Sequence, residues 1–561
     1  MIIDARTIDV TQPLEADICI IGSGPAGITL ARELSSTQSL KICLLESGDR
    51  EFDPAIQALY EGELDSKSGY PQNELTAGRC RQLGGSANFW EIQIDDEDVA
   101  KNIFNVRHVI PDEIDFQKRD AIPHSGWPFE RSELIPYYER AQKICKIGPL
   151  SYDAKDWETA DRPQLNLSAQ GIESRIFQFG PRAAFAHDYI EELRNTPNVN
   201  IYTYANAVEL LTHSDGQVVE KVRVVTSIDQ GFLVKAKTFI LATGGMENAR
   251  LLLLSDSVHT SGIGNRKDLV GRFYMDHPAF NFGILKPKNS SLFNKMGLYD
   301  LHRAQGTAAM ARLIFSEETL RKEQLLNIGL ALVPQIKGIE TQSVMFFRQF
   351  TQSLRNRNLS SKTFAYLQKS LSNAGEVTSY LRFRALKLKQ PIYNTMRGGW
   401  SSLPHNNKRF FAFYIAAQTE QTPSPDNRIS LSNIKDDLGY PRTKLTWTWQ
   451  QSDINSINRS QELLRQAVTQ SNLGEFQPQF ELSMGARPYI ASPHHHLGTT
   501  RMHDSPHQGV VDRHCRVHGV ANLFIAGSSV FPTGLGYANP TLTIIALATR
   551  LSDHIKKQFS L

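Results

Sequence analysis

Apolar runs near the start of the chain alternate with one amphipathic stretch. Residues 17–21 and 41–46 are largely apolar, and residues 28–34 between them have the spacing of an amphipathic helix. Buried strands of parallel sheets read as continuous apolar runs, and two such strands joined by a helix form a βαβ unit of about 30 residues. The pattern therefore predicts a parallel sheet near the N-terminus.

Strand-like alternation dominates residues 195–245 and returns later in the chain. The pattern predicts strands at 199–204, 207–211, 218–226, 232–237 and 238–243, the last of them leading through Gly244 and Gly245 into a helix. A hairpin is predicted from strands at 428–431 and 443–449, and an apolar helix from Asn539 to about residue 555.

Residues 337–397 differ from the rest in charge. They contain eleven Lys or Arg but only two carboxylates, Glu340 and Glu376, and aromatic residues are interleaved with the basic ones. We expect an inserted helical lobe. Three roles are compatible with it: a solvated basic face, a lid over a large or amphiphilic substrate, and a patch for an anionic surface or redox partner.

Composition excludes several classes of protein. With 561 residues, 40% of them hydrophobic, and a formal charge of +3, the chain is globular and is not expected to bind nucleic acid. Its five cysteines are scattered without a C-x-x-C pair, which argues against zinc modules and disulfide scaffolds and favours a reducing, cytoplasmic location. No apolar stretch approaches the roughly 18 residues of a transmembrane segment.

A glycine motif marks the first predicted βαβ unit. Gly22, Gly24 and Gly27 give G-x-G-x-x-G after a strand and before a helix, and Glu46 ends the second strand about 20 residues further on. Backbone N–H groups of such a loop bind a pyrophosphate, and the carboxylate accepts hydrogen bonds from a ribose. A tight turn with a surface Glu is the alternative. NAD and FAD use the same device, so the choice needs residues elsewhere.

Further motifs supply that choice. They are Arg81-Gln-Leu-Gly84-Gly85-Ser86-Ala-Asn88, Gly244-Gly245-Met-Glu-Asn248, Asp276-His277-Pro278, Asp426-Asn427-Arg428, His494-His495-His496-Leu-Gly498-Thr499 and Asn539-Pro540-Thr541. In order and approximate spacing they resemble the glucose–methanol–choline (GMC) family of FAD-dependent oxidoreductases. The resemblance runs from about residue 16 to the C-terminus, and only the basic lobe lies outside it. Differences in the residues of these motifs suggest a bacterial branch with some similarity to pyranose oxidase-type sugar oxidases.

The resemblance implies an α/β fold, α+β overall, with two interleaved domains. A Rossmann-like FAD-binding domain is expected from residues 1–110, 195–285 and 500–561. A substrate-binding domain of antiparallel sheet plus helices is expected from residues 111–194 and 286–499, the latter including the basic helical insert 337–397.

The resemblance also assigns cofactor-binding residues. It places the first three glycines at the pyrophosphate, Glu46 at the ribose and Val208 near the adenine. Residues 85–88 would lie beside the isoalloxazine ring, and residues 527–528 near the ribityl chain. The expected set is Gly22, Gly24, Gly27, Glu46, Arg81, Gly85, Ser86, Asn88, Val208, Gly244, Gly527, Ser528, Asn539, Pro540 and Thr541. Residues 86–90 contain no histidine that could link the flavin, so noncovalent FAD is expected.

Alcohol oxidation needs a base for the hydroxyl proton while hydride leaves the carbon. The family's catalytic histidine corresponds to His495, and its partner position carries Asn539, which could hold the substrate oxygen. Pro540 would begin a helix whose positive end faces the flavin. No metal is expected, because three consecutive histidines of an extended segment cannot all face one ion. No G-x-S-x-G elbow suggests a serine nucleophile.

Together these features predict FAD-dependent oxidation of a CH–OH group in a sugar, glycoside or polyol. The alternatives are oxidation of a hydroxyl on a larger apolar secondary metabolite, a non-redox flavin-dependent lyase, and a catalytically silent flavoprotein. The intact His495 and Asn539 pair argues against the silent form. The sequence leaves open whether oxygen, a quinone or a redox protein accepts the electrons, and it identifies neither the substrate nor the oligomeric state.

Overall fold

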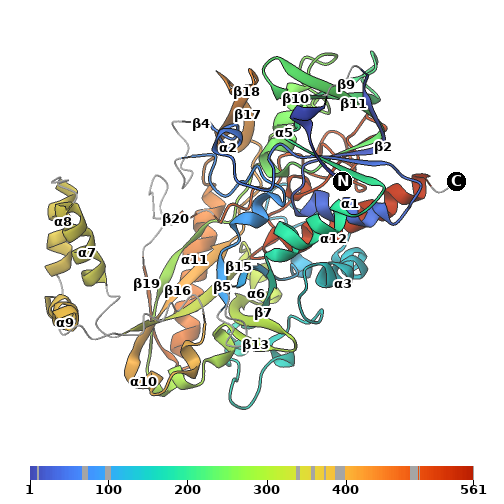
Figure 1. Ribbon diagram of the computed structural model, residues 1–561. Helices are drawn as coiled ribbons and strands as arrows, with labels where there is room; N and C mark the ends of the chain where they lie inside the picture. Colours follow the sequence, from blue (N-terminus) through green and yellow to red (C-terminus); the bar gives the residue numbers. More distant parts are fainter. Residues whose placement is uncertain are drawn as a thin grey trace.

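The structure is a computed structural model of the chain (Figure 1). It describes residues 1–8, 12–65, 74–94, 103–336, 342–355, 361–371, 374–385, 398–479, 490–491 and 493–559.

One sheet of eight strands contains the N-terminal βαβ unit. Strands β2 and β3 pair in parallel with Ile18 opposite Ile42, and α1 (Pro25–Ser35) connects them, as the sequence predicts. The strands expected at 232–237 and 238–243 form one continuous strand, β11, because no turn interrupts the chain there. The order is β1 (Ile2–Asp4), β8 (Val199–Thr203), β3 (Ile42–Leu45), β2 (Leu14–Ile21), β11 (Gln230–Leu241), β10 (Val219–Ser227) and β9 (Asn206–Thr212), with β21 (Leu523–Ile525) also paired to β11.

Helices pack on this sheet and on one another. The C-terminal helix α12 (Pro540–Phe559) lies against α1, and α3 (Ile135–Ile144) packs on α12 (Figure 1). Helix α5 (Gly244–Leu254) follows β11 directly, as expected, and contacts β9. Four shorter helices are α2 (Pro54–Ala58), α4 (Tyr189–Arg194), α6 (Glu317–Glu323) and α10 (Asn406–Arg409).

A second, ten-stranded antiparallel sheet has its own core. Buried Phe282, Phe413 and Trp400 belong to that core, and so do residues of the long helix α11 (Gln451–Gln470), including Ile457. The order is β19 (Gly474–Pro478), β12 (Ala279–Pro287), β16 (Phe410–Thr419), β15 (Ile328–Ile336), β14 (Thr307–Phe315), β7 (Ile172–Pro181), β6 (Ile103–His108) and β5 (Ile92–Ile94), with β13 (His302–Ala304) on β14 and β20 (Ile490–Ala491) on β12.

The ten-stranded sheet draws on chain segments that the resemblance assigns to FAD binding. Strands β5 and β6 lie within residues 1–110, and most of β12 lies within 195–285, yet all three pair in this sheet. The expected hairpin forms from β17 (Arg428–Lys435) and β18 (Pro441–Thr446) and is joined by β4 (Gly62–Leu64) in a third, three-stranded sheet.

The basic insert forms helices, as predicted. Helices α7 (Gln342–Arg355), α8 (Ser361–Leu371) and α9 (Ala374–Ala385) lie between β15 and β16 in the chain and stand apart from both sheets (Figure 1). Ile336 and Phe410 are paired at the base of this insertion. Within the described ranges, no helix is long and apolar enough to cross a membrane.

Candidate active site

A cavity of about 440 Å³ lies at the carboxyl ends of the parallel strands β2, β3 and β11. Ligands bind at this edge in open α/β sheets, because the loops and helix N-termini that follow the strands meet there. Segments on β6 and at 493–496 close the other side of the cavity. His495 and every expected cofactor-binding residue except Gly27 and Asn88 line it.

Gly27 and Asn88 instead shape the loops behind the cavity. A Cβ on Gly27 would lie 1.9 Å from the Gly22 carbonyl oxygen, so glycine is needed where α1 crosses the end of β2. The Asn88 amide donates to the Leu83 and Gly85 carbonyls at 2.9 and 3.0 Å, which fixes the second glycine loop. The missing side chain of Gly27 and the hydrogen bonds of Asn88 set the loop geometry, although neither residue lines the cavity.

The glycine loops leave room for a diphosphate. A Cβ built on Gly24, Gly244 or Gly527 would meet no atom within 4 Å, so each of these glycines opens on free space at the cavity. Gly24 caps α1 without a side chain, which leaves first-turn N–H groups for an anionic ligand. The buried Arg81 Nε has no hydrogen-bond partner. These residues fit the pyrophosphate of FAD.

Glu46 is held in place at the end of β3. Its carboxylate accepts hydrogen bonds from the Ser23 N–H at 3.0 Å, the Ser23 hydroxyl at 2.7 Å and the Gly48 N–H at 2.9 Å. The side chain is buried but lines the cavity. A fixed carboxylate beside a glycine loop suits the hydroxyls of a ribose.

An arginine cluster anchors Arg81. Glu247 pairs with Arg79 at 2.9 Å, Arg81 at 3.0 Å and Arg250 at 3.2 Å, and Arg250 also bonds Asp436. Burial by itself would raise the pKa of Glu247, but the three arginines together lower it to about 2. Three cations face two carboxylates, and the remaining positive charge suits an anionic ligand.

At the other end of the cavity, Asp276 brings two histidines together. Its Oδ1 accepts hydrogen bonds from the backbone N–H of His277 at 2.7 Å and of His495 at 3.0 Å. The two rings then meet with their Nδ1 atoms 2.7 Å apart. Asp276 therefore joins a loop before β12 to the loop that carries the expected base.

The hydrogen bonds assign the proton positions on both rings. His277 Nε2 lies 2.6 Å from the Gly534 carbonyl oxygen and must donate to it, so the neutral His277 ring accepts at Nδ1. His495 then donates from Nδ1, which leaves a lone pair on its Nε2. Nε2 lies 3.3 Å from the Asn539 amide nitrogen, and both residues line the cavity.

Arg107 orients Asn539. The Arg107 Nε donates to Asn539 Oδ1 at 2.9 Å, so the amide nitrogen points to His495, and Arg107 Nη2 donates to Gln418. Burial lowers the pKa of Arg107 to about 10, and no ion pair with a described carboxylate compensates this cation. One guanidinium thus fixes the orientation of the Asn539 amide.

Burial keeps the histidines neutral. It lowers the pKa of His495 well below the ordinary value, and the neighbouring His277, Arg107, His496 and His494 lower it further. Burial also lowers the pKa of His277, and that of His496 to about 3. At neutral pH His495 is therefore an unprotonated base.

Sequence reasoning missed two parts of this site. His277 stands in the quoted Asp276-His277-Pro278 motif, so its sequence signal was visible, but its contact with His495 spans 218 positions. Arg107 lies in β6 without any motif, and its partner Asn539 is 432 positions away. Only the tertiary structure, which places β6 and His277 beside residues 495 and 539, brings these groups together.

Two expectations about the cavity can be compared with the structure. Among the described residues, no group of His, Cys, Asp or Glu has the arrangement of a metal site. No described residue of α7, α8 or α9 is among the residues that line the cavity.

Known proteins match this chain over nearly its full length. Residues 423–548 match the family model described as GMC oxidoreductase. The fructose dehydrogenase large subunit of Gluconobacter japonicus is 25% identical, with 97% of this chain and 98% of that protein covered. The 2-methyl-1,2-propanediol dehydrogenase of Mycolicibacterium austroafricanum is 23% identical, with 98% and 97% covered. The fold matches formate oxidase from Aspergillus oryzae RIB40 with a TM-score of 0.54 at 16% identity, covering 98% and 99%.

The fold, the cavity and these matches define an FAD-dependent oxidoreductase that acts on CH–OH groups. The chain resembles the glucose–methanol–choline oxidoreductase family, whose model its residues 423–548 match.

Two glycine substitutions should separate cofactor binding from folding. Gly24→Val places a branched side chain in the open space of the cavity, so the variant should fold but retain no FAD. Gly27→Ala pushes Cβ into the Gly22 carbonyl, so it should lower the thermal unfolding temperature as well. Flavin absorbance of the purified proteins and thermal unfolding followed by circular dichroism measure both effects. Normal flavin content in folded Gly24→Val would place the cofactor elsewhere.

Proposed function

We propose that this enzyme oxidises a hydroxyl of a sugar, glycoside or polyol, with His495 as the base and Asn539 as the group that holds the substrate oxygen. The observation that carries the proposal is the fixed lone pair on His495 Nε2, which faces the cavity beside the Asn539 amide. The proton positions on the ring are set before the substrate arrives, so the substrate hydroxyl has only to replace the Asn539 amide hydrogen at this lone pair.

The proton step follows from the hydrogen-bond chain. When bound, FAD supplies the acceptor for the hydride that leaves the substrate carbon. His495 Nε2 takes the hydroxyl proton while its Nδ1–H remains bonded to His277. The resulting imidazolium is stabilised because its Nδ1–H donates to His277, whose Nε2–H in turn donates to the Gly534 carbonyl.

Asn539 and Arg107 act on the substrate oxygen. The Asn539 amide nitrogen carries two hydrogens, of which one faces His495 and the second is free for the oxygen as negative charge develops. Arg107 prevents the amide from turning over, because it bonds the amide oxygen. The N-terminus of α12, which starts at Pro540 beside the cavity, adds a favourable dipole for negative charge.

The polar end of the cavity and the names of the relatives support a polyhydroxylated donor. Asn105, Arg107, His495 and Asn539 all line it, and such groups bind hydroxyls that an apolar alcohol lacks. Fructose and a propanediol are the donors named for two relatives. An apolar secondary metabolite gains no support from the basic insert, since its described residues lie off the cavity.

We also propose that FAD is bound without a covalent link, inside a cell compartment that keeps thiols reduced. The 86–90 loop holds no histidine, and all five cysteines are free and buried. The division into FAD-binding segments 1–110, 195–285 and 500–561 remains part of this proposal. Strands β5, β6 and β12 would then serve as the junctions between the two domains.

Removing the base should slow hydride transfer without loss of cofactor. His495→Ala should keep FAD and reduce the rate of anaerobic flavin reduction by about 10²- to 10⁴-fold. Asn539→Ala should reduce it by about 10²- to 10³-fold, and the double variant should lose less than the product of the two. Stopped-flow absorbance with a panel of sugars and polyols measures these rates. His213→Ala, at an exposed histidine just after β9, is the matched control, and wild-type reduction by His495→Ala would disprove the proposed role.

Arg107 should contribute to the acid limit of the reaction, together with burial and the neighbouring His277. Because the pKa of His495 lies well below its ordinary value, reduction should stay pH-independent down through about pH 6.5 and fall only at lower pH. Arg107→Met removes a cation that lowers this pKa, so the acid limb should move to higher pH. Arg107→Lys keeps the positive charge but loses the guanidinium that bonds both Asn539 and Gln418. It should therefore lower the rate without moving the acid limb of the pH profile. Identical pH profiles for Arg107→Met and Arg107→Lys would refute the electrostatic role of Arg107.

Release of the flavin tests its mode of binding. Acid or heat should transfer all of the FAD to the supernatant, because the loop offers no linking histidine. FAD modification is described for the Aspergillus formate oxidase, so the released flavin should also be identified by mass spectrometry. Flavin that stays on the denatured chain would contradict noncovalent binding.

A further inference from the structure

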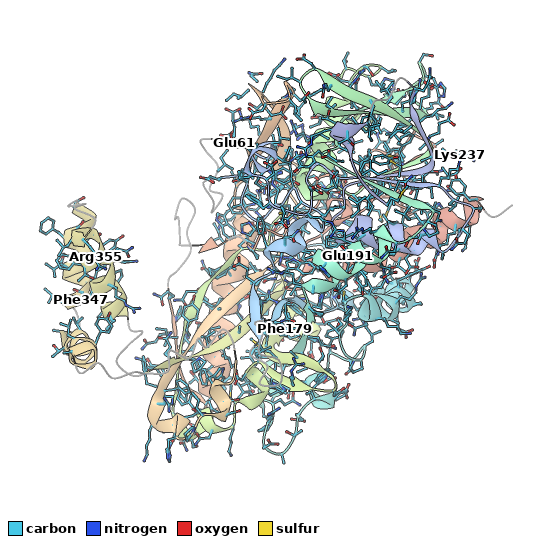
Figure 2. The ribbon with its side chains drawn as sticks, viewed as in Figure 1. Glu61, Phe179, Glu191, Lys237, Phe347 and Arg355 are labelled. Atoms are coloured by element: carbon cyan, nitrogen blue, oxygen red, sulfur yellow. The ribbon has the colours of Figure 1, made fainter. Side chains whose placement is uncertain are left out.

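The helices α7, α8 and α9 form a separate small body that we call the basic lobe. They pack on one another: the Phe346 ring stacks on Tyr366 with centroids 6.1 Å apart, and Phe347 meets Tyr380 edge-on at 6.4 Å. Val344 and Tyr380 are buried between the helices. Figure 2 shows Phe347 and Arg355 on this group of helices, away from Phe179 in the ten-stranded sheet.

The basic lobe carries an unusual amount of exposed apolar surface. Four of the ten large hydrophobic residues exposed among the described residues lie on its three helices. They are Leu354, Phe364, Leu371 and Leu381, exposed by 45%, 64%, 60% and 46%. Phe364 and Leu371 stand seven residues apart on α8, so they project from the same side of the helix two turns apart. A solvated face does not require such residues, and several of them together mark a contact surface.

The charge of the protein is strongly segregated toward this insert. Residues 337–397 contain eleven Lys or Arg and two Glu, a net charge of +9, whereas the whole chain carries +3. The rest of the chain is therefore negative, at −6. Arg348 and Arg355 are exposed, and neither pairs with a carboxylate in the part of the chain that is described.

We infer that the basic lobe docks the enzyme on an anionic lipid surface. Basic residues that alternate with exposed Phe and Leu are typical of helices lying in a membrane interface, where the cations reach headgroups and the apolar side chains enter the acyl boundary. The negative remainder of the chain is repelled by the same surface, so the lobe is the part that faces it. This inference does not depend on the substrate proposed above.

Vesicle sedimentation with the full-length, FAD-loaded protein tests the inference. The protein should sediment with vesicles of phosphatidylcholine containing roughly one third phosphatidylglycerol, but not with phosphatidylcholine alone, and binding should weaken steeply with added salt. Phe364→Ser with Leu371→Ser should lower the partition coefficient by at least about tenfold, and Arg355→Glu by about three- to tenfold.

Matched variants on the body of the protein provide the controls. Ile228→Ser with Ile434→Ser removes equally exposed apolar residues, and Lys267→Glu reverses an exposed cation, so both should bind vesicles like wild type. All variants should retain wild-type flavin content and rates of reduction by a soluble donor, which separates this test from the proposed chemistry. Equal binding to both vesicle types, no binding to either, or equal loss in the body controls would overturn the inference. A lobe-dependent dimer in the absence of vesicles would instead assign the surface to a second copy of the chain.

Discussion

The proton on the ring of His495 is placed by a hydrogen-bond chain that begins at a backbone carbonyl. Gly534 can only accept, so His277 must donate to it, His495 must donate to His277, and the lone pair must fall on His495 Nε2. At the other end Arg107 can only donate, so it fixes the Asn539 amide. Two groups that cannot change roles therefore determine the state of three that can.

This hydrogen-bond chain depends on how the ten-stranded sheet is placed against the segment that precedes α12. Gly534 and Asn539 precede α12, which packs on α1 of the N-terminal βαβ unit, whereas Arg107 and Gln418 belong to β6 and β16 of the ten-stranded sheet. Asp276 ties the loops of His277 and His495 through their backbones. A shift between the sheets would break several buried hydrogen bonds at once, and each unpaired buried group would cost about 1–3 kcal/mol.

Electrostatics divides the molecule into three regions. The arginine cluster around Glu247 leaves positive charge at one end of the cavity, and at the other end burial and the neighbouring His277 and Arg107 keep His495 neutral. A third positive region lies on the basic lobe, far along the chain from the other two. The same kind of side chain thus leaves positive charge beside the cavity in one place, lowers the pKa of His495 in another and is exposed on a surface in the third.

The sequence alone determined the parts that rest on local pattern. Continuous apolar runs and the spacing of Gly22, Gly24 and Gly27 specified the βαβ unit, because strand, turn and helix there are neighbours along the chain. The lobe was visible as helices through its composition, and His495 and Asn539 through motifs shared with a family. Only the tertiary structure decided that β5, β6 and β12 join the second sheet, that Gly27 and Asn88 lie behind the cavity, and that His277 and Arg107 reach the base. These are contacts between residues hundreds of positions apart, and the direction of a hydrogen bond depends on which groups meet, which no local pattern of residues encodes.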